Sequence, residues 1–129
     1  MNQEARYWRD EARESLETAR VLLRENRYLE SAFFCHLATE KMLKAIIVEH
    51  TAQTPPRSHN LLLLAQVSGV DRDFDERMKS FLTEVAPFQI EGRYPVERKR
   101  LLEENPPQRF DRLYEATREA ISWLDLKLK

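Results

Sequence analysis

The chain has 129 residues, a formal net charge of −1 and 33% charged residues, which fits one soluble domain and excludes the strong basic excess of many nucleic-acid-binding proteins. Only two glycines and one cysteine are present, which excludes Walker-type phosphate loops, an intramolecular disulfide and a cysteine-based zinc site. No apolar run reaches the ~18 residues of a membrane span and the first residues show no signal peptide, so we expect a cytoplasmic protein without membrane contact.

Residues 4–25 are predicted to form the first helix. Apolar side chains recur there every three or four positions, at Trp8, Ala12, Leu16, Ala19 and Leu23. Asn26 can end this helix, because asparagine tolerates the left-handed backbone conformation. The connection to the next helix is short, and we therefore expect an antiparallel hairpin.

The second predicted helix, from Tyr28 to about Glu49, is apolar on almost every side, which is typical of the central helix of a bundle. Its middle nevertheless carries ionisable side chains, at His36, Glu40, Lys41 and Lys44. Such groups need partners, water or a ligand when they are buried. The lone Cys35 beside them is interpreted as a small buried hydrophobic residue.

A short third helix is predicted over the segment LLLLAQV (61–67), with Ser58 as its cap and Gly69 at its end. Asp73 and Glu76 have the spacing of a capping box and are predicted to begin a fourth helix. Pro87 should stop or kink that helix, because proline cannot donate the backbone hydrogen bond.

Residues 89–105 show no clean periodicity and are predicted to form a loop, which at this length is usually functional or mobile. Pro106 and Pro107 then introduce the last helix, since proline is tolerated in a first turn. The fold class predicted from these elements is all-α. We expect one domain over residues 1–129, built as an antiparallel up-and-down bundle of four main helices and one short helix.

Two alternatives are open for the polar residues of the second helix. Lys41 and Lys44 could form a partly positive pocket floor suited to a phosphate. Alternatively, Glu40 could pair with Lys44, one turn away, while His36 bonds a backbone carbonyl. A metal site is not predicted, because one histidine and one glutamate on one helix supply only two ligands.

Two further segments have both a binding and a structural interpretation. Arg57 and His59 precede the third helix, where a helix N-terminus attracts anions, or they form an exposed capping turn. Arg93 and Tyr94 precede further basic residues and suit RNA or nucleotide binding through phosphate contact and base stacking, or they belong to a solvated charged face. No nucleophile has a motif around it, so neither a catalytic residue nor a cofactor is predicted.

Three segments together resemble the HEPN domain family, in its nucleotidyltransferase-associated branch. They are EKMLK (40–44) within the second helix, SHNL (58–61) and RYP (93–95), in the order and spacing of that family. The resemblance implies an antiparallel helical bundle that commonly dimerises. It also implies a minimal nucleotidyltransferase as partner, often in a toxin–antitoxin pair, and nucleotide binding in some relatives.

The ribonuclease branch of the family carries an R-x(4–6)-H motif near the last helix. This chain lacks the motif, because none of its three histidines, His36, His50 and His59, has an arginine five to seven residues before it. We therefore expect a homodimeric binding module that acts with a minimal nucleotidyltransferase. Its nucleotide or phosphate site is predicted at Lys41, Lys44, Arg57, His59, Arg93 and Tyr94.

Two other functions stay open. The chain could be a metal-independent ribonuclease toxin in which His59, with Arg57 or Arg93, acts on RNA. It could also be a purely structural, dimeric interaction protein, with Trp8, Trp123 and the apolar second helix at the dimer seam.

Overall fold

The computed structural model describes residues 1–90 and 94–129, and within them the chain forms six α-helices, two 3-10 helices and no strand. The predicted all-α class is confirmed. The elements are α1 (Gln3–Arg24), α2 (Tyr28–Thr51), α3 (Leu61–Ser68), η1 (Val70–Asp73), α4 (Glu76–Val85), η2 (Ala86–Ile90), α5 (Pro95–Glu104) and α6 (Pro107–Leu126). None of the helices in the described ranges combines the length and the apolar character that crossing a bilayer requires.

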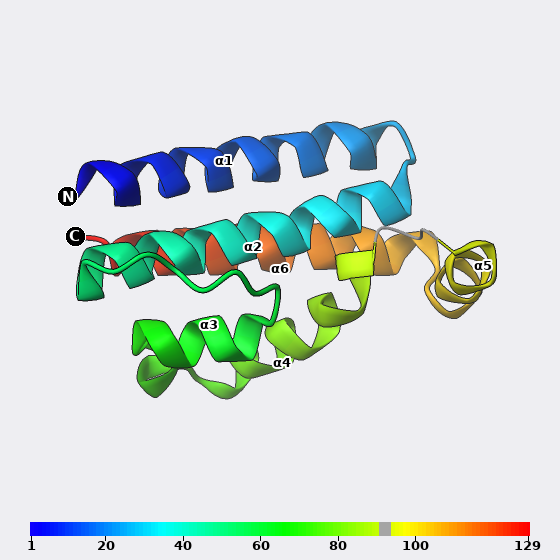
Figure 1. Ribbon diagram of the computed structural model, residues 1–129. Helices are drawn as coiled ribbons and strands as arrows, with labels where there is room; N and C mark the ends of the chain where they lie inside the picture. Colours follow the sequence, from blue (N-terminus) through cyan, green and yellow to red (C-terminus); the bar gives the residue numbers. More distant parts are fainter. Residues whose placement is uncertain (91–93) are drawn as a thin grey trace.

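The first two helices lie side by side and run in opposite directions (Figure 1). Asn26 adopts a φ of 61°, so the left-handed end of α1 is confirmed. Inside the hairpin, Ser31 Oγ donates a hydrogen bond to the Ala19 carbonyl at 2.7 Å. This bond satisfies a buried hydroxyl and fixes the register of the two helices.

Helix α2 is the central element, as its sequence predicts. Helices α1, α3 and α6 and the 3-10 helix η2 all pack against it. Its fully buried side chains include the large apolar residues Met42, Leu43, Ile46 and Ile47. A helix covered on so many sides cannot show a single apolar stripe, which explains the unbroken hydrophobic character of its sequence.

The predicted loop over residues 89–105 is wrong, because α5 lies within that range. Pro95 occupies its first turn, and Arg100 pairs with Glu97 and Glu104, one turn away on either side. Leu101 is the buried residue of α5, so this helix has no apolar stripe that periodicity could detect.

The predicted bundle of four main helices and one short helix is not confirmed, because the described ranges contain six α-helices, α5 among them. Figure 1 shows α6 running in the same direction as α2, with α5 lying between α4 and α6 along the chain. The extra helix turns the chain at that end of the molecule, and the last helix then returns along α2.

Two predicted helix caps lie close to the real ones in the sequence but do not coincide with them. The cap of α3 is Asn60, whose side chain accepts from the backbone N–H three residues on at 3.1 Å, and not Ser58. The cap of α4 is Asp75, which accepts in the same way at 2.8 Å, and not Asp73, which belongs to η1. Gly69 ends α3 as predicted, with a φ of 81° that favours glycine.

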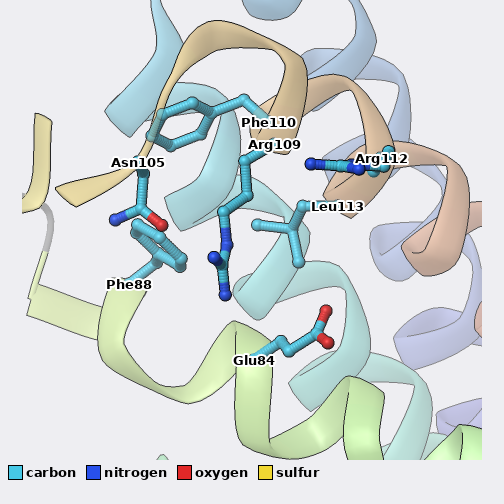
Figure 2. Close-up of a pocket in the computed structure, with 7 residues that line it drawn as sticks. All are labelled: Glu84, Phe88, Asn105, Arg109, Phe110, Arg112 and Leu113. Carbon is cyan, nitrogen blue, oxygen red and sulfur yellow. The ribbon is translucent and has the colours of Figure 1, made fainter.

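Two neighbouring cavities open on the surface beside α4 and α6. The first measures about 340 Å³ and is drawn in Figure 2. It is lined by Glu84, Phe88, Asn105, Arg109, Phe110, Arg112 and Leu113. The second measures about 410 Å³, has a more apolar floor that includes Trp123, and shares Glu84 and Arg112 with the first.

Candidate functional site

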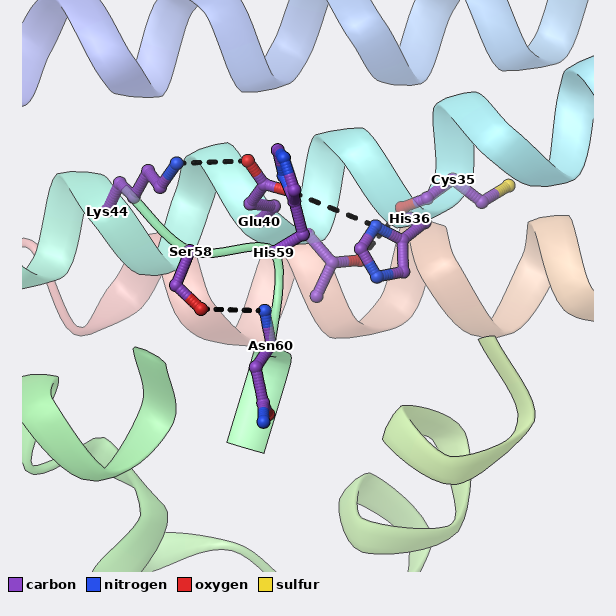
Figure 3. A network of polar contacts seen from close by, with 8 residues as sticks. Cys35, His36, Glu40, Lys44, Ser58, His59 and Asn60 are labelled. Carbon is purple, nitrogen blue, oxygen red and sulfur yellow. Dashed lines mark hydrogen bonds and ion pairs between the residues drawn. The ribbon is translucent and has the colours of Figure 1, made fainter. Parts of the chain in front are cut away.

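Glu40 is the centre of a polar cluster on the inner part of α2 (Figure 3). Its side chain is almost fully buried, at 4% exposure. Lys44, one turn further along the helix, donates from Nζ to Glu40 Oε2 at 3.0 Å. His59 Nδ1 lies 2.9 Å from Oε1, and His36 Nδ1 lies 3.9 Å from the same oxygen. A buried carboxylate is costly without such partners, and this one has them on two sides.

Lys44 is held in place by a second contact. Its ammonium group lies over the ring of Trp8 from α1, 5.4 Å from the ring centroid. Cation–π attraction strengthens when the cation is desolvated, and Lys44 is buried. The 3.0 Å contact between Lys44 and Glu40 confirms the predicted pair, and the two charges offset each other inside the fold.

His36 stands beside this pair as a neutral ring. Burial lowers the pKa of His36 from 6.5 to about 4; the carboxylate of Glu40 opposes this shift, and His59 adds to it. The imidazole of His36 is consequently uncharged near neutral pH. Of the two α2 residues beside Glu40, Lys44 therefore carries a positive charge and His36 does not.

His59 reaches Glu40 from the segment between α2 and α3. Figure 1 shows this segment running back along α2 before α3 begins, and Pro55 within it is buried. The path brings together two residues that are 19 positions apart in the sequence. Residue spacing alone could not indicate the bond between His59 and Glu40, because the bond depends on where this segment is anchored.

The bond to Glu40 fixes how His59 can interact with a ligand. A carboxylate oxygen accepts, so Nδ1 of His59 carries the hydrogen and Nε2 is left for a ligand. The side chain of His59 is 74% exposed, which makes that second nitrogen reachable. The neutral ring offers a hydrogen-bond acceptor or proton base at Nε2, and the protonated ring offers a donor to an anion.

The other predicted site residues lie in different surroundings. Lys41 points toward α1, where its Nζ donates to Ser15 Oγ at 3.0 Å and lies 3.4 Å from Glu11 Oε1. Arg57 is exposed and lies two residues before His59 on the same segment. The structure thus brings Lys44 and His59 together through Glu40, and Arg57 lies two residues before His59 in the chain.

Tyr94 lies elsewhere, directly before α5, and is 66% exposed. Helix α5 is tied to the beginning of α2 by an ion pair of 2.9 Å between Arg98 and Glu30. Glu30 precedes Glu40 by ten residues, which is roughly 15 Å along a helix. Arg93 lies outside the described residues.

Cys35, next to the cluster, is not suited to act as a nucleophile. Cys35 is fully buried, as predicted, and burial raises the pKa of its thiol to about 12. A thiol with so high a pKa stays protonated and is a poor nucleophile. In the part of the chain that the structure describes, no three histidine, cysteine, aspartate or glutamate side chains are grouped so that they could hold a metal ion.

Comparison with models of protein families matches residues 5–127 to the family described as HEPN domain. The match runs from the first turn of α1 to the residue after α6 and includes the whole polar cluster. No curated protein and no solved structure matches the chain.

Proposed function

The chain belongs to the HEPN domain family, and we propose that it is a nucleotide- or phosphate-binding module whose central contact is His59. The observation that supports this most directly is the 2.9 Å bond between the exposed His59 ring and the buried Glu40 carboxylate. Glu40 holds the ring in one orientation before a ligand arrives. Such preorganisation reduces the conformational entropy that binding costs.

The predicted site residues have different roles in this proposal. His59 and Arg57 contact the anion from the exposed segment before α3. Lys44 neutralises Glu40, so the carboxylate does not repel an incoming phosphate as an unpaired charge would. Lys41 supports the site from the α1 side, and Arg93 and Tyr94 retain the predicted roles of phosphate contact and base stacking for a longer ligand.

Calorimetric titration with ATP, AMP and inorganic phosphate at low salt tests the binding role. The wild-type protein should bind ATP, and His59→Ala should weaken binding about tenfold or more, since hydrogen bonds to charged groups contribute about 1.5–3 kcal/mol. His50→Ala is the matched control, because the ring nitrogens of His50 face the carbonyl oxygens of Ser68 and Lys127 and not Glu40. Absence of ATP binding at millimolar concentration, or equal binding by His59→Ala, contradicts the proposal.

We also propose a homodimer that acts with a minimal nucleotidyltransferase in a toxin–antitoxin-like pair. The family supports both parts, because HEPN domains often dimerise and relatives of this kind often act with such an enzyme. Light scattering after size exclusion should give twice the 15.4 kDa chain mass. A nucleotidyltransferase encoded by the neighbouring gene should co-purify and relieve any growth arrest. A 15.4 kDa particle at all concentrations contradicts the dimer, and failure to co-purify contradicts the partnership.

A second candidate function is metal-independent RNA cleavage. One observation favours it, which is that a carboxylate-held histidine with a reachable Nε2 has the arrangement of a general base. The sequence lacks the R-x(4–6)-H motif of the ribonuclease branch. Incubation of RNA with the protein in EDTA separates the two functions. Cleavage that disappears in His59→Ala supports the ribonuclease, whereas intact RNA supports the binding module.

A further inference from the structure

The cavity of about 340 Å³ beside the start of α6 has the composition of an anion site. Arg109 and Arg112 line it from α6, three residues apart and hence on one face of the helix. Figure 2 shows the Arg109 side chain extending between Phe88 and Leu113 toward Glu84. Two guanidinium groups therefore border one cavity, against a single carboxylate.

These two arginines differ from other arginines near α6. Arg118 pairs with Glu115 on the same helix at 2.9 Å, and Arg77 of α4 pairs with Glu119 at 2.6 Å. Within residues 1–90 and 94–129, no carboxylate lies at ion-pair distance from Arg109 or Arg112. The N–H groups of both guanidinium groups can thus donate to a ligand, and their fork geometry matches phosphate oxygens.

The rest of the lining determines which anion fits. Phe88 and Phe110 are buried and form an apolar wall. Their rings are in edge-to-face contact, with the ring centroids 5.7 Å apart. Asn105 is fixed by donating to the Leu101 carbonyl at 2.8 Å, which leaves its amide oxygen as an acceptor. Glu84 supplies a further acceptor. A ligand of matching chemistry has a phosphate, a small apolar portion and hydroxyl or amine donors.

We propose that this cavity is a second ligand site, which binds a small phosphate monoester through Arg109 and Arg112. The site is separate from the His59 site and does not rest on it. Its volume lies at the lower end of the range of small-molecule pockets, which limits the ligand to about the size of a mononucleotide. Glu84 can accept hydrogen bonds from the alcohol hydroxyl groups of an organic phosphate ester, which inorganic phosphate lacks, so it favours the ester over inorganic phosphate.

Titration of ¹⁵N-labelled protein with AMP, inorganic phosphate and adenosine tests the site directly. With AMP, the side-chain amide of Asn105 and the backbone amides of the first turn of α6 should shift and saturate. The Arg109→Ala and Arg112→Ala variants should each weaken this response about tenfold or more. Inorganic phosphate should produce the same shifts more weakly, and adenosine alone should produce none that depend on the two arginines.

Three further variants distinguish binding in this cavity from non-specific charge attraction and from binding at His59. Arg118→Ala removes a paired arginine of the same helix and should leave the AMP response unchanged. His59→Ala should abolish shifts in the segment before α3 while the Asn105 shift remains. Glu84→Gln should tighten binding of inorganic phosphate several-fold and reduce the preference for AMP. The proposal is overturned if AMP leaves the Asn105 and α6 signals unmoved, or if the Arg109→Ala/Arg112→Ala double variant responds like the wild type.

Discussion

Among single residues, Glu40 connects the stability of the fold with the proposed site. It is buried, it accepts from Lys44, and it orients His59. Lys44 in turn has the ring of Trp8 on its other side. Removal of one partner of a buried ion pair leaves the other charge without compensation, which costs more than the pair itself contributes.

We therefore predict that Glu40→Ala lowers the free energy of unfolding by about 3–5 kcal/mol, because it leaves the Lys44 ammonium buried without its carboxylate. Urea unfolding followed by circular dichroism measures this loss. The control is Glu103→Ala, which removes an exposed carboxylate from a 3.9 Å pair with Lys99 and should cost less than about 1 kcal/mol. Similar losses of unfolding free energy in the two variants would show that the buried pair stabilises the fold no more than the exposed pair does.

Burial of His36 makes the stability of the fold depend on pH. It lowers the pKa of this histidine from 6.5 to about 4, so the unfolded chain binds a proton that the folded protein does not hold. The contribution is present above pH 6.5 and is lost progressively as the pH falls toward 4. Since one pKa unit corresponds to about 1.4 kcal/mol, the loss from this residue approaches about 3 kcal/mol.

Unfolding free energies measured from about pH 7.5 down to about pH 4 test this expectation, since the loss falls between pH 6.5 and the lowered pKa of about 4. A His36→Gln variant lacks the titrating ring, and its stability should fall less steeply than that of the wild type across this range. If the unfolding free energies of the two proteins fall equally steeply with pH, the folded protein does not lower the pKa of His36.

Part of the cluster around Glu40 could be predicted from the sequence. The ionisable residues inside an apolar helix indicated a polar cluster, and the pair between Glu40 and Lys44 follows from their spacing of four. The contacts made by His59 and Trp8 could not be predicted. Each comes from a different element, and its position depends on tertiary packing that local periodicity does not encode.

At the scale of whole elements, the helices with a strong apolar pattern were the predictable ones. Helices α1, α2 and α6 all lie where their sequences place them. Helix α5 was missed because it buries only Leu101 among the residues of its span, and its Val96 is 82% exposed. Its charged side chains pair along its own surface, as with Arg100 and its two glutamates. Such a helix has no amphipathic signature to detect.

The caps give a test at this scale. We predict that Asp75→Ala destabilises the protein by about 1 kcal/mol, because Asp75 accepts from the backbone at the start of α4 and its charge favours the helix dipole. Asp73→Ala should cost less, since Asp73 makes an exposed pair with Lys127. Thermal or urea unfolding compares the two variants. A larger loss for Asp73→Ala would place the start of α4 at the capping box that the sequence suggested.

At the scale of the whole molecule, α2 organises both the core and the proposed site. Its apolar side chains supply the packing of the bundle on several sides, and its middle supplies Glu40 and Lys44 under the segment that carries His59. The all-α class and the family could be recognised from the sequence, because they depend on composition, periodicity and three short motifs. The presence of α5 could not, because this helix has no apolar stripe that periodicity detects.

The most direct test of the proposed binding site is the imidazole of His59 during an ATP titration, observed by ¹H–¹⁵N correlation spectroscopy of the histidine rings. We predict that Nδ1 of His59 is protonated and hydrogen-bonded before ATP is added, and that the Nε2 resonance then shifts and saturates while the His50 ring remains unchanged. A His59 ring that stays at its starting shifts with saturating ATP would contradict the proposed binding site.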